Sequence, residues 1–122
     1  MISTQQYGNV TVVRAEIDRL DAVLGRQLVT HMRDYLTPRA NVILNLADVT
    51  YLNSEAIGFI TASARRQKHR DGGLSVCCLR PGPREVFKIL RMEQVLAGIY
   101  EAEADAIAAF ETPTRRVMTQ RG

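Results

Sequence analysis

The chain has 122 residues, of which 46% are hydrophobic, so it suits one globular domain with a real core and is not a disordered protein. Its formal net charge of +3 is mild and falls partly in the C-terminal residues, so charge gives no argument for a nucleic-acid partner. The sequence contains no signal peptide and no long apolar run, so we expect a cytoplasmic protein without membrane insertion.

Residues that bind metals or form disulfides are few. Cys77 and Cys78 are neighbours in a predicted strand, where adjacent side chains point to opposite faces, so we expect no bridge between them. His31 and His69 have no cysteine or carboxylate at ligand spacing, which argues against a metal site. Because a phosphate-binding loop, a nucleophile with its base and a cofactor motif are also missing, the sequence predicts no enzyme and no cofactor.

The first forty residues predict a hairpin and a helix. Residues 2–6 and 10–15 read as strands joined by a turn at Gly8-Asn9. A helix is predicted over about 22–36, because apolar side chains recur there at spacings of three and four. The stripe consists of Leu24, Leu28, Met32 and Tyr35 or Leu36.

Three features define this helix further. Asp18 or Asp21 can cap it by accepting from the free N–H groups of the first turn. Thr37-Pro38 ends it, because a residue before proline avoids the α region. Gly25 inside the helix costs about 1 kcal/mol against alanine, and it would permit close packing on the sheet.

A strand–helix–strand unit is the centre of the predicted fold. The apolar runs 42–46 and 74–79 read as strands, the first of them buried on both faces. A helix is predicted between them from Glu55 to about residue 70, and Asp71-Gly72-Gly73 ends it. Two strands joined in this way are most simply parallel, so the open end at Asn53-Ser54-Glu55 is where we expect function.

Basic residues at the end of this helix allow two interpretations. Arg65, Arg66, Lys68, His69 and Arg70 could bind a polyanion, or they could form a solvated face that favours the negative end of the helix dipole. We favour the solvated face, and we predict that these residues bind no nucleic acid.

The last third of the chain predicts a helix, a short strand and a final helix. Pro81-Gly82-Pro83 makes a turn and starts the first helix, which four apolar residues would anchor. These anchors are Val86, Phe87, Ile89 and Leu90. A strand within 95–99 and a helix over 101–110 follow, so residues 1–112 form one domain and residues 113–122 a flexible tail.

One run in the middle of the chain reads Leu44-Asn45-Leu46-Ala47-Asp48-Val49-Thr50-Tyr51-Leu52-Asn53-Ser54-Glu55-Ala56-Ile57-Gly58. This run resembles the STAS family, whose founding members are bacterial anti-sigma-factor antagonists. The resemblance continues through Gly72-Gly73-Leu74, the helix 83–90 and the closing segment 99–110, and it covers roughly residues 8–112. The resemblance implies an α/β fold with a mixed, largely parallel sheet of four to five strands. Helices would pack mainly on one face of that sheet.

The resemblance also implies a partner and a surface that binds it. In such antagonists a serine at the start of this helix is phosphorylated by an anti-sigma factor that is also a serine kinase of the histidine-kinase-like ATPase type. The unphosphorylated form binds this kinase and frees the sigma factor, which regulates transcription by partner switching. The implied partner-binding residues in this chain are Asn53, Ser54, Glu55, Ala56, Ile57 and Gly58.

The chain departs from the family pattern at the phosphorylated position. Glu55 stands there, Asn53 replaces the preceding Asp and Ala56 replaces the following Gly. Glu55 cannot accept phosphate, and its single charge is smaller than the −1.5 to −2 or so that a phosphate adds. Ser54 is the only hydroxyl left in the motif and therefore the candidate phosphorylation site, although either Asn53 or Ser54 can cap the helix.

Two hypotheses for Glu55 and three for the whole chain follow. Glu55 either mimics phosphate and locks the non-binding state, or is accepted by the partner, which makes binding independent of phosphorylation there; we favour the second. For the whole chain, the first hypothesis is a binding protein of the antagonist type. The second hypothesis is a STAS accessory subunit of a lipid-transport ATPase or a stressosome-like scaffold, because fold alone does not fix function. The third, an enzyme or nucleotide-binding protein, is the one we favour least.

Overall fold

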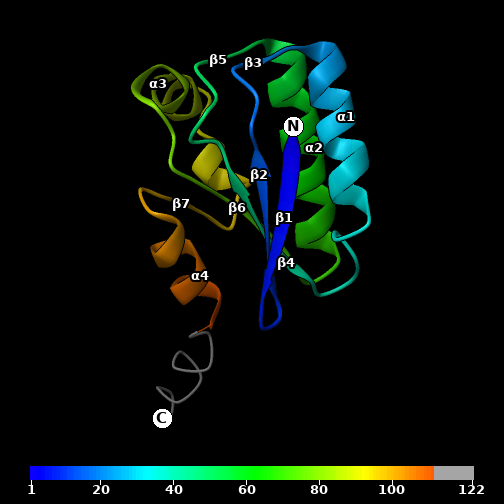
Figure 1. Ribbon diagram of the computed structural model, residues 1–122. Coiled ribbons are helices and arrows are strands. Elements are labelled where there is room, and N and C mark those ends of the chain that lie inside the picture. Colours follow the sequence, from blue (N-terminus) through cyan, green and yellow to red (C-terminus); the bar gives the residue numbers. More distant parts are fainter. Residues whose placement is uncertain (112–122) are drawn as a thin grey trace.

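A five-stranded sheet organises the chain in the computed structural model, which describes residues 1–111 (Figure 1). Its spatial order is β1 (Ile2–Tyr7), β2 (Val10–Ala15), β4 (Asn41–Asn45), β6 (Gly73–Cys77) and β7 (Gly98–Tyr100). The β1–β2 pair is antiparallel and every other pair is parallel. The predicted hairpin and parallel central strands are confirmed, whereas the predicted tail over 113–122 lies outside the described residues.

Helices cover the two faces of the sheet unequally. The first face carries α1 (Ala22–Arg33) and α2 (Ser54–His69), which pack against each other, and the opposite face carries α4 (Glu103–Glu111) (Figure 1). A short parallel pair, β3 (Arg19–Leu20) with β5 (Tyr51–Leu52), lies apart from the main sheet. The helix α3 (Pro81–Ile89) contacts β5, and a turn of 3-10 helix, Met92–Gln94, follows it. The predicted α/β class, with helices mainly on one face, is confirmed.

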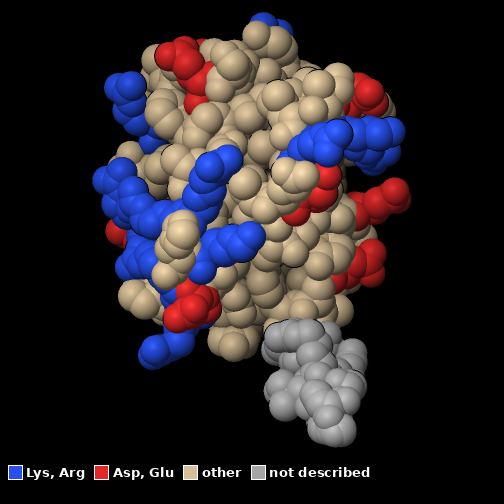
Figure 2. Space-filling view, turned by 180° about the vertical axis from the view of Figure 1, so that it is seen from behind, with Lys and Arg blue, Asp and Glu red and all other residues tan. Residues whose placement is uncertain are grey.

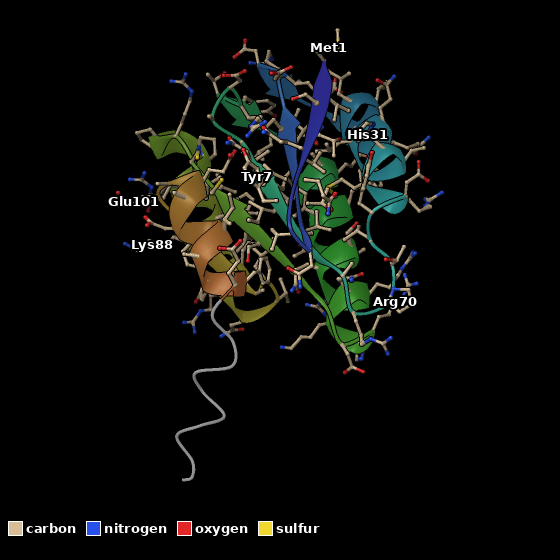
Figure 3. The ribbon with its side chains drawn as sticks, turned by 60° about the horizontal axis from the view of Figure 1, so that its bottom comes forward. Met1, Tyr7, His31, Arg70, Lys88 and Glu101 are labelled. Carbon is tan, nitrogen blue, oxygen red and sulfur yellow. The ribbon has the colours of Figure 1, made fainter. Side chains whose placement is uncertain are left out.

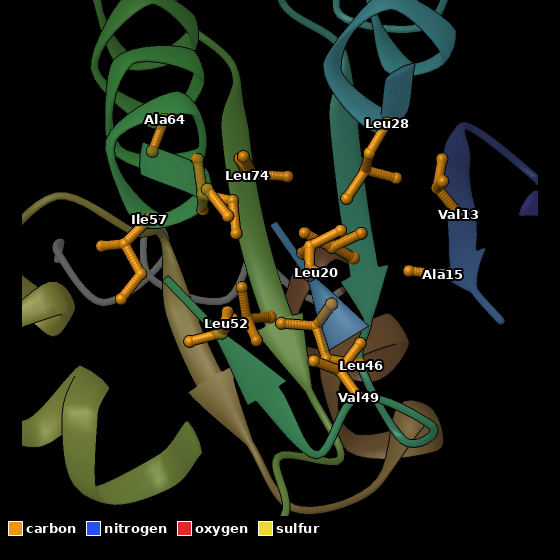
Figure 4. Close-up of a cluster of buried hydrophobic side chains, with 14 of the residues drawn as sticks. Val13, Ala15, Leu20, Leu28, Leu46, Val49, Leu52, Ile57, Ala64 and Leu74 are labelled. Atoms are coloured by element: carbon orange, nitrogen blue, oxygen red, sulfur yellow. The ribbon is translucent and has the colours of Figure 1, made fainter. Parts of the chain in front are cut away.

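The strand β4 is buried on both sides, as its continuous apolar run predicts. Val42, Leu44 and, beyond the strand end, Leu46 join the larger core on the α1/α2 side of the sheet. Ile43 points to the other side and joins the smaller cluster under α4. Figure 4 shows the larger core, which also contains the predicted α2 stripe of Ile57, Ile60 and Ala64.

Three predicted boundaries need correction. The helix α1 ends at Arg33 and not at residue 36, because the N–H groups of Tyr35 and Leu36 both donate to the Met32 carbonyl in a closing turn. The strand β6 ends at Cys77, because the backbone of Cys78 turns into the left-handed region with φ of 68°. The last strand is Gly98–Tyr100, later than predicted, because the 3-10 turn Met92–Gln94 comes first and the N–H groups of Val95 and Leu96 close it on the Met92 carbonyl.

Two packing predictions also fail. Ile89 and Leu90 are 68% and 52% exposed, because α3 turns the side containing Pro83 and Phe87 toward the core, and Ile89 projects from roughly the opposite side. Gly25 permits close packing on a helix and not on the sheet. A Cβ built at Gly25 would lie 3.2 Å from the Cα of Ala56 on α2.

Candidate partner-binding surface

Two helices begin side by side at the carboxyl edge of the parallel strands, and the β3–β5 pair fixes their starting points. Asp21 caps α1, since its Oδ1 accepts from the Leu24 N–H at 2.9 Å. Asn53 caps α2 in the same way, accepting from the Ala56 N–H at 2.9 Å. The Asn53 N–H in turn donates to the Leu20 carbonyl at 3.2 Å, so β3 holds the cap of the second helix. The structure therefore assigns the caps to Asp21 and Asn53.

The six predicted partner-binding residues separate into two groups. Ala56 and Ile57 are buried and belong to the large core, so their side chains hold α2 against the sheet. Ser54, Glu55 and Gly58 are exposed, and Asn53 is half-buried because of its capping bond. The exposed three share one side of the helix, since residues three and four apart are neighbours on its surface. We call Ser54, Glu55 and Gly58 the antagonist surface.

The two polar side chains of the antagonist surface have no bonding partners among the described residues. Within residues 1–111, neither the Ser54 hydroxyl nor the Glu55 carboxylate makes a hydrogen bond or an ion pair. Asn53 caps the helix, a role for which Ser54 was also a candidate, so the Ser54 hydroxyl is not needed as a cap. The Glu55 carboxylate lies in the first turn, where the positive end of the helix dipole favours it. A free hydroxyl and a free carboxylate are thus presented together to solvent.

Gly58, the third member, is not required by the packing of the fold. A Cβ built there would meet no heavy atom of another described part of the chain within 4 Å, and its φ is not positive. Glycine inside a helix is less favourable than alanine by about 1 kcal/mol. The helix α2 therefore carries a destabilising residue on its exposed side without a gain in packing.

Two exposed residues that sequence reasoning missed lie just before the two helix caps. Tyr51 is 43% exposed, and the Arg19 guanidinium stacks over its ring at 4.3 Å from the centroid. Both residues come from the β3–β5 pair, which precedes the two helix caps. A signal for this pair exists in the sequence, because Arg19-Leu20-Asp21 and Tyr51-Leu52-Asn53 repeat one pattern of exposed residue, buried leucine and cap.

The basic residues of α2 lie at its other end. Arg65, Arg66 and Lys68 are exposed in the last turns of the helix, and Figure 2 shows Lys and Arg gathered on one side of the back of the molecule. Arg65 to Lys68 follow Glu55 by 10 to 13 residues, or about 15–20 Å along the helix axis, so these cations and Glu55 lie at opposite ends of α2. The prediction that they bind no nucleic acid stays a prediction.

The two histidines take structural or exposed positions. His31 shares a hydrogen bond of 2.8 Å with the Thr4 hydroxyl and packs against Tyr35, so it ties α1 to β1 (Figure 3). His69 is exposed at the end of α2. The described part of the chain contains no group of three or more His, Cys, Asp or Glu residues placed to hold a metal ion. No helix in residues 1–111 is both long and apolar enough to cross a membrane.

The single ion pair among the described residues fastens α4 to the sheet. Arg14 on β2 donates from Nε and one terminal nitrogen to the Glu103 carboxylate, at 3.0 and 2.6 Å, and Asn45 on β4 donates to the same carboxylate at 2.7 Å. Burial alone raises the pKa of Glu103, but the hydrogen bonds from Arg14 and Asn45 outweigh it and hold that pKa below its usual value. This network is structural and lies on the sheet face opposite α2.

Comparisons with known proteins agree with this architecture. Solved structures with the same fold include a STAS domain protein from Planctomyces limnophilus, with a TM-score of 0.81, 20% identity and coverage of 91% of this chain and 98% of that one. An anti-sigma factor antagonist from Mycobacterium paratuberculosis has a TM-score of 0.77, 17% identity and coverage of 89% and 92%. The Bacillus protein SpoIIAA in its phosphorylated form has a TM-score of 0.69, 17% identity and coverage of 90% and 99%.

At these identities the likeness establishes the fold and leaves the partner open. No curated protein sequence matches the chain. The family model of the STAS domain, however, matches residues 1–106, which is most of the chain. The resemblance seen in the Leu44–Gly58 run is therefore confirmed, and the chain belongs to the STAS domain family.

Proposed function

We propose that this chain is an anti-sigma-factor antagonist, a regulatory binding protein and not an enzyme, that switches the partner of an anti-sigma factor and so regulates transcription. Its partner is an anti-sigma factor and serine kinase of the histidine-kinase-like ATPase type. Contact is made through the antagonist surface of Ser54, Glu55 and Gly58. The observation that carries the proposal is this exposed side of α2, which combines two free polar side chains with a glycine that the fold does not need.

Gly58 supports a close contact with a partner. Because glycine has no side chain, it lets the backbone of another protein approach the helix more closely than any other residue type does. Because the fold gains nothing at Gly58, its conformational cost of about 1 kcal/mol is explained by something outside the fold. A partner surface packed against the second turn of α2 supplies that explanation.

Glu55 serves in this proposal as a contact and not as a locked mimic of phosphate. Its one charge is partly neutralised by the dipole at the start of α2, whereas a phosphate brings about −1.5 to −2 charge and three strong acceptors. An arginine or lysine of the partner facing Glu55 gains a charge-assisted hydrogen bond. Binding is then independent of phosphorylation at position 55.

Ser54 is the residue through which phosphate regulates this surface. Its hydroxyl is exposed and free because Asn53 caps the helix. Phosphate on Ser54 would stand beside the Glu55 carboxylate and would concentrate negative charge where the partner approaches. The phosphorylated form is therefore the one that the partner releases.

Calorimetric titration of the kinase partner tests the proposal. The partner used is the histidine-kinase-like ATPase that a pull-down with this chain as bait recovers from the native host. The variants are Ser54→Ala, Glu55→Ser and Glu55→Lys. Glu101→Lys makes the same charge change as the last of these at an exposed site near α4, and it serves as the matched control.

We expect Glu55→Lys to weaken binding at least about tenfold, because it places a cation opposite a cation. Ser54→Ala and Glu101→Lys should bind as wild type does, and Ser54→Ala should no longer accept phosphate. If Glu55→Ser instead binds much more tightly than wild type and becomes phosphorylated at residue 55, Glu55 is a phosphate mimic. If the captured partner is a lipid-transport ATPase, the antagonist role itself is wrong.

A further inference from the structure

The sulfur atoms of two neighbouring cysteines lie in contact at the end of β6. The expectation that Cys77 and Cys78 point to opposite faces is wrong, because Cys78 leaves the strand with φ of 68°. This left-handed conformation turns its side chain back, and the two Sγ atoms lie 3.3 Å apart. A residue other than glycine rarely adopts such a φ, and backbone strain of this kind tends to occur at functional positions. Both cysteines are free thiols.

The surrounding structure holds Cys78 in this conformation. Its N–H donates to the Tyr100 carbonyl at 3.0 Å, while the Cys77 carbonyl accepts from the Leu46 N–H at 3.1 Å. The peptide between the cysteines is thus fixed from both sides, by β7 and by the segment after β4. The short sulfur–sulfur distance is consequently a property of the folded chain.

The two thiols differ in their access to solvent. Cys77 is fully buried among the side chains under α4, with Val10, Ile43 and Ala106 as neighbours in the cluster. Burial, together with its hydrogen bond from Cys78, raises the pKa of the Cys77 thiol. Cys78 is only half-buried. A reagent from solvent therefore reaches Cys78 first, and Cys77 reacts through Cys78.

We propose that Cys77 and Cys78 form a redox modification site, a vicinal dithiol that a low-molecular-weight disulfide converts reversibly into an intramolecular Cys77–Cys78 disulfide. Cys78, after losing its proton, attacks one sulfur of oxidised glutathione, and the first glutathione leaves as a thiolate that takes up a proton. Cys77 then attacks Sγ of Cys78, the bond to the second glutathione breaks, and the proton of Cys77 passes to that leaving sulfur. Two electrons move from the cysteine pair to the glutathione pair, which ends as two thiols.

The geometry makes this disulfide easy to reduce again. Neighbouring Cα atoms lie about 3.8 Å apart across a trans peptide, whereas disulfides usually join Cα atoms about 4.4–6.8 Å apart. A bond formed outside the usual range is strained and has a more oxidising potential, as labile and regulatory disulfides do. The site therefore responds to the thiol balance of its surroundings and does not act as a permanent staple.

The modification acts on the same edge of the sheet as the antagonist surface. Cys78 begins the segment that joins β6 to α3, and in that segment Arg80 donates from Nε to the Ala47 carbonyl at 2.8 Å. Ala47 follows β4 on the way to Asn53. Closure of the disulfide thus changes a segment that is bonded to the loop in front of α2.

Intact-mass spectrometry of the folded protein with excess oxidised glutathione tests the proposal. The chain has two cysteines only, so each product has its own mass. Wild type should lose two hydrogen atoms, keep no glutathione, form no disulfide-linked dimer and return to its first mass in reduced glutathione. Cys77→Ala should keep one glutathione on Cys78, because the resolving thiol is gone. Cys78→Ser should stay unmodified until urea exposes Cys77.

The contrary results are equally distinct. A wild-type protein that keeps one glutathione, as Cys77→Ala does, would show that Cys77 does not resolve the mixed disulfide. A disulfide-linked dimer would show that the sulfur contact does not direct the reaction, and modification of folded Cys78→Ser at the wild-type rate would show that Cys77 is accessible. If Cys77→Ala fails to fold, wild type and Cys78→Ser decide the question by themselves.

Discussion

Gly25 and Gly58 lie early in the two neighbouring helices of one sheet face, yet only one of them is explained by the fold. A side chain at Gly25 would press on Ala56 and Phe59, so the approach of α1 to α2 depends on its absence. A side chain at Gly58 would extend into open space. The inner side of α2 is thus determined by packing, while its outer side at the first two turns carries residues that packing does not require.

The largest effect is expected on the inner side. Leu44→Ala removes a fully buried side chain of β4 from the core beneath α1 and α2. Truncation of a buried leucine lowers the free energy of unfolding by about 2–5 kcal/mol. Urea denaturation followed by circular dichroism measures this loss, and an unchanged midpoint would contradict the placement of β4 at the centre of the sheet.

Overpacking of the helix contact is the next largest effect. Gly25→Val inserts a branched side chain where even a Cβ would come within 3.1 Å of Phe59 and 3.2 Å of Ala56. Overfilled contacts of this kind destabilise by about 1–3 kcal/mol. The same urea titration applies, with Thr30→Val as a control at an exposed position of α1. Equal stability of the two variants would remove the contrast between the two glycines.

The Arg14–Glu103 network on the opposite sheet face gives a smaller, pH-dependent effect. Glu103→Gln should lower the free energy of unfolding by about 1 kcal/mol at neutral pH, since both side chains are partly exposed and solvent screens the pair. Because the folded pKa of Glu103 is lowered, its contribution is complete above the usual value of 4.5 and is lost as pH falls through the folded pKa. Wild type and variant should therefore converge in acid, and a constant difference across pH would refute this assignment.

The smallest effect on stability belongs to the outer side of α2. Gly58→Ala should raise the free energy of unfolding by about 0.5–1 kcal/mol, because alanine restricts the unfolded chain and meets no obstacle in the folded one. Thermal denaturation detects the rise. A loss of stability would mean that the fold itself needs this glycine, and the contrast with Gly25 would disappear.

The sequence predicted the inner parts of the molecule better than its edges. The run 42–46 and the stripe of Ile57, Ile60 and Ala64 were readable because continuous and helical apolar patterns reflect burial directly. The β3–β5 pair was missed because a strand of two residues is too short to show a period. Ile89 and Leu90 were wrongly predicted to lie in the core, since an apolar residue need not be buried.

The sequence indicated a candidate site along the chain, and only the structure distinguishes the roles of its residues in the fold. The sequence indicated residues 53–58 but could not separate Asn53 from Ser54 as the cap, because both types accept from the first turn. Nor could it show that Ala56 and Ile57 face inward. The contact of Cys77 with Cys78 depends on a positive φ at a residue that gives no sign of it in the sequence.

The central claim is that a partner, and not the fold, accounts for the outer side of α2, and one titration tests it most directly. The affinity of the proposed kinase partner is measured by calorimetry for wild type, Gly58→Ala and Thr30→Ala, the last being a stabilising control on the exposed side of α1. We predict that Gly58→Ala is more stable than wild type but binds at least about tenfold more weakly, while Thr30→Ala keeps the wild-type affinity. Equal or tighter binding by Gly58→Ala would contradict the claim.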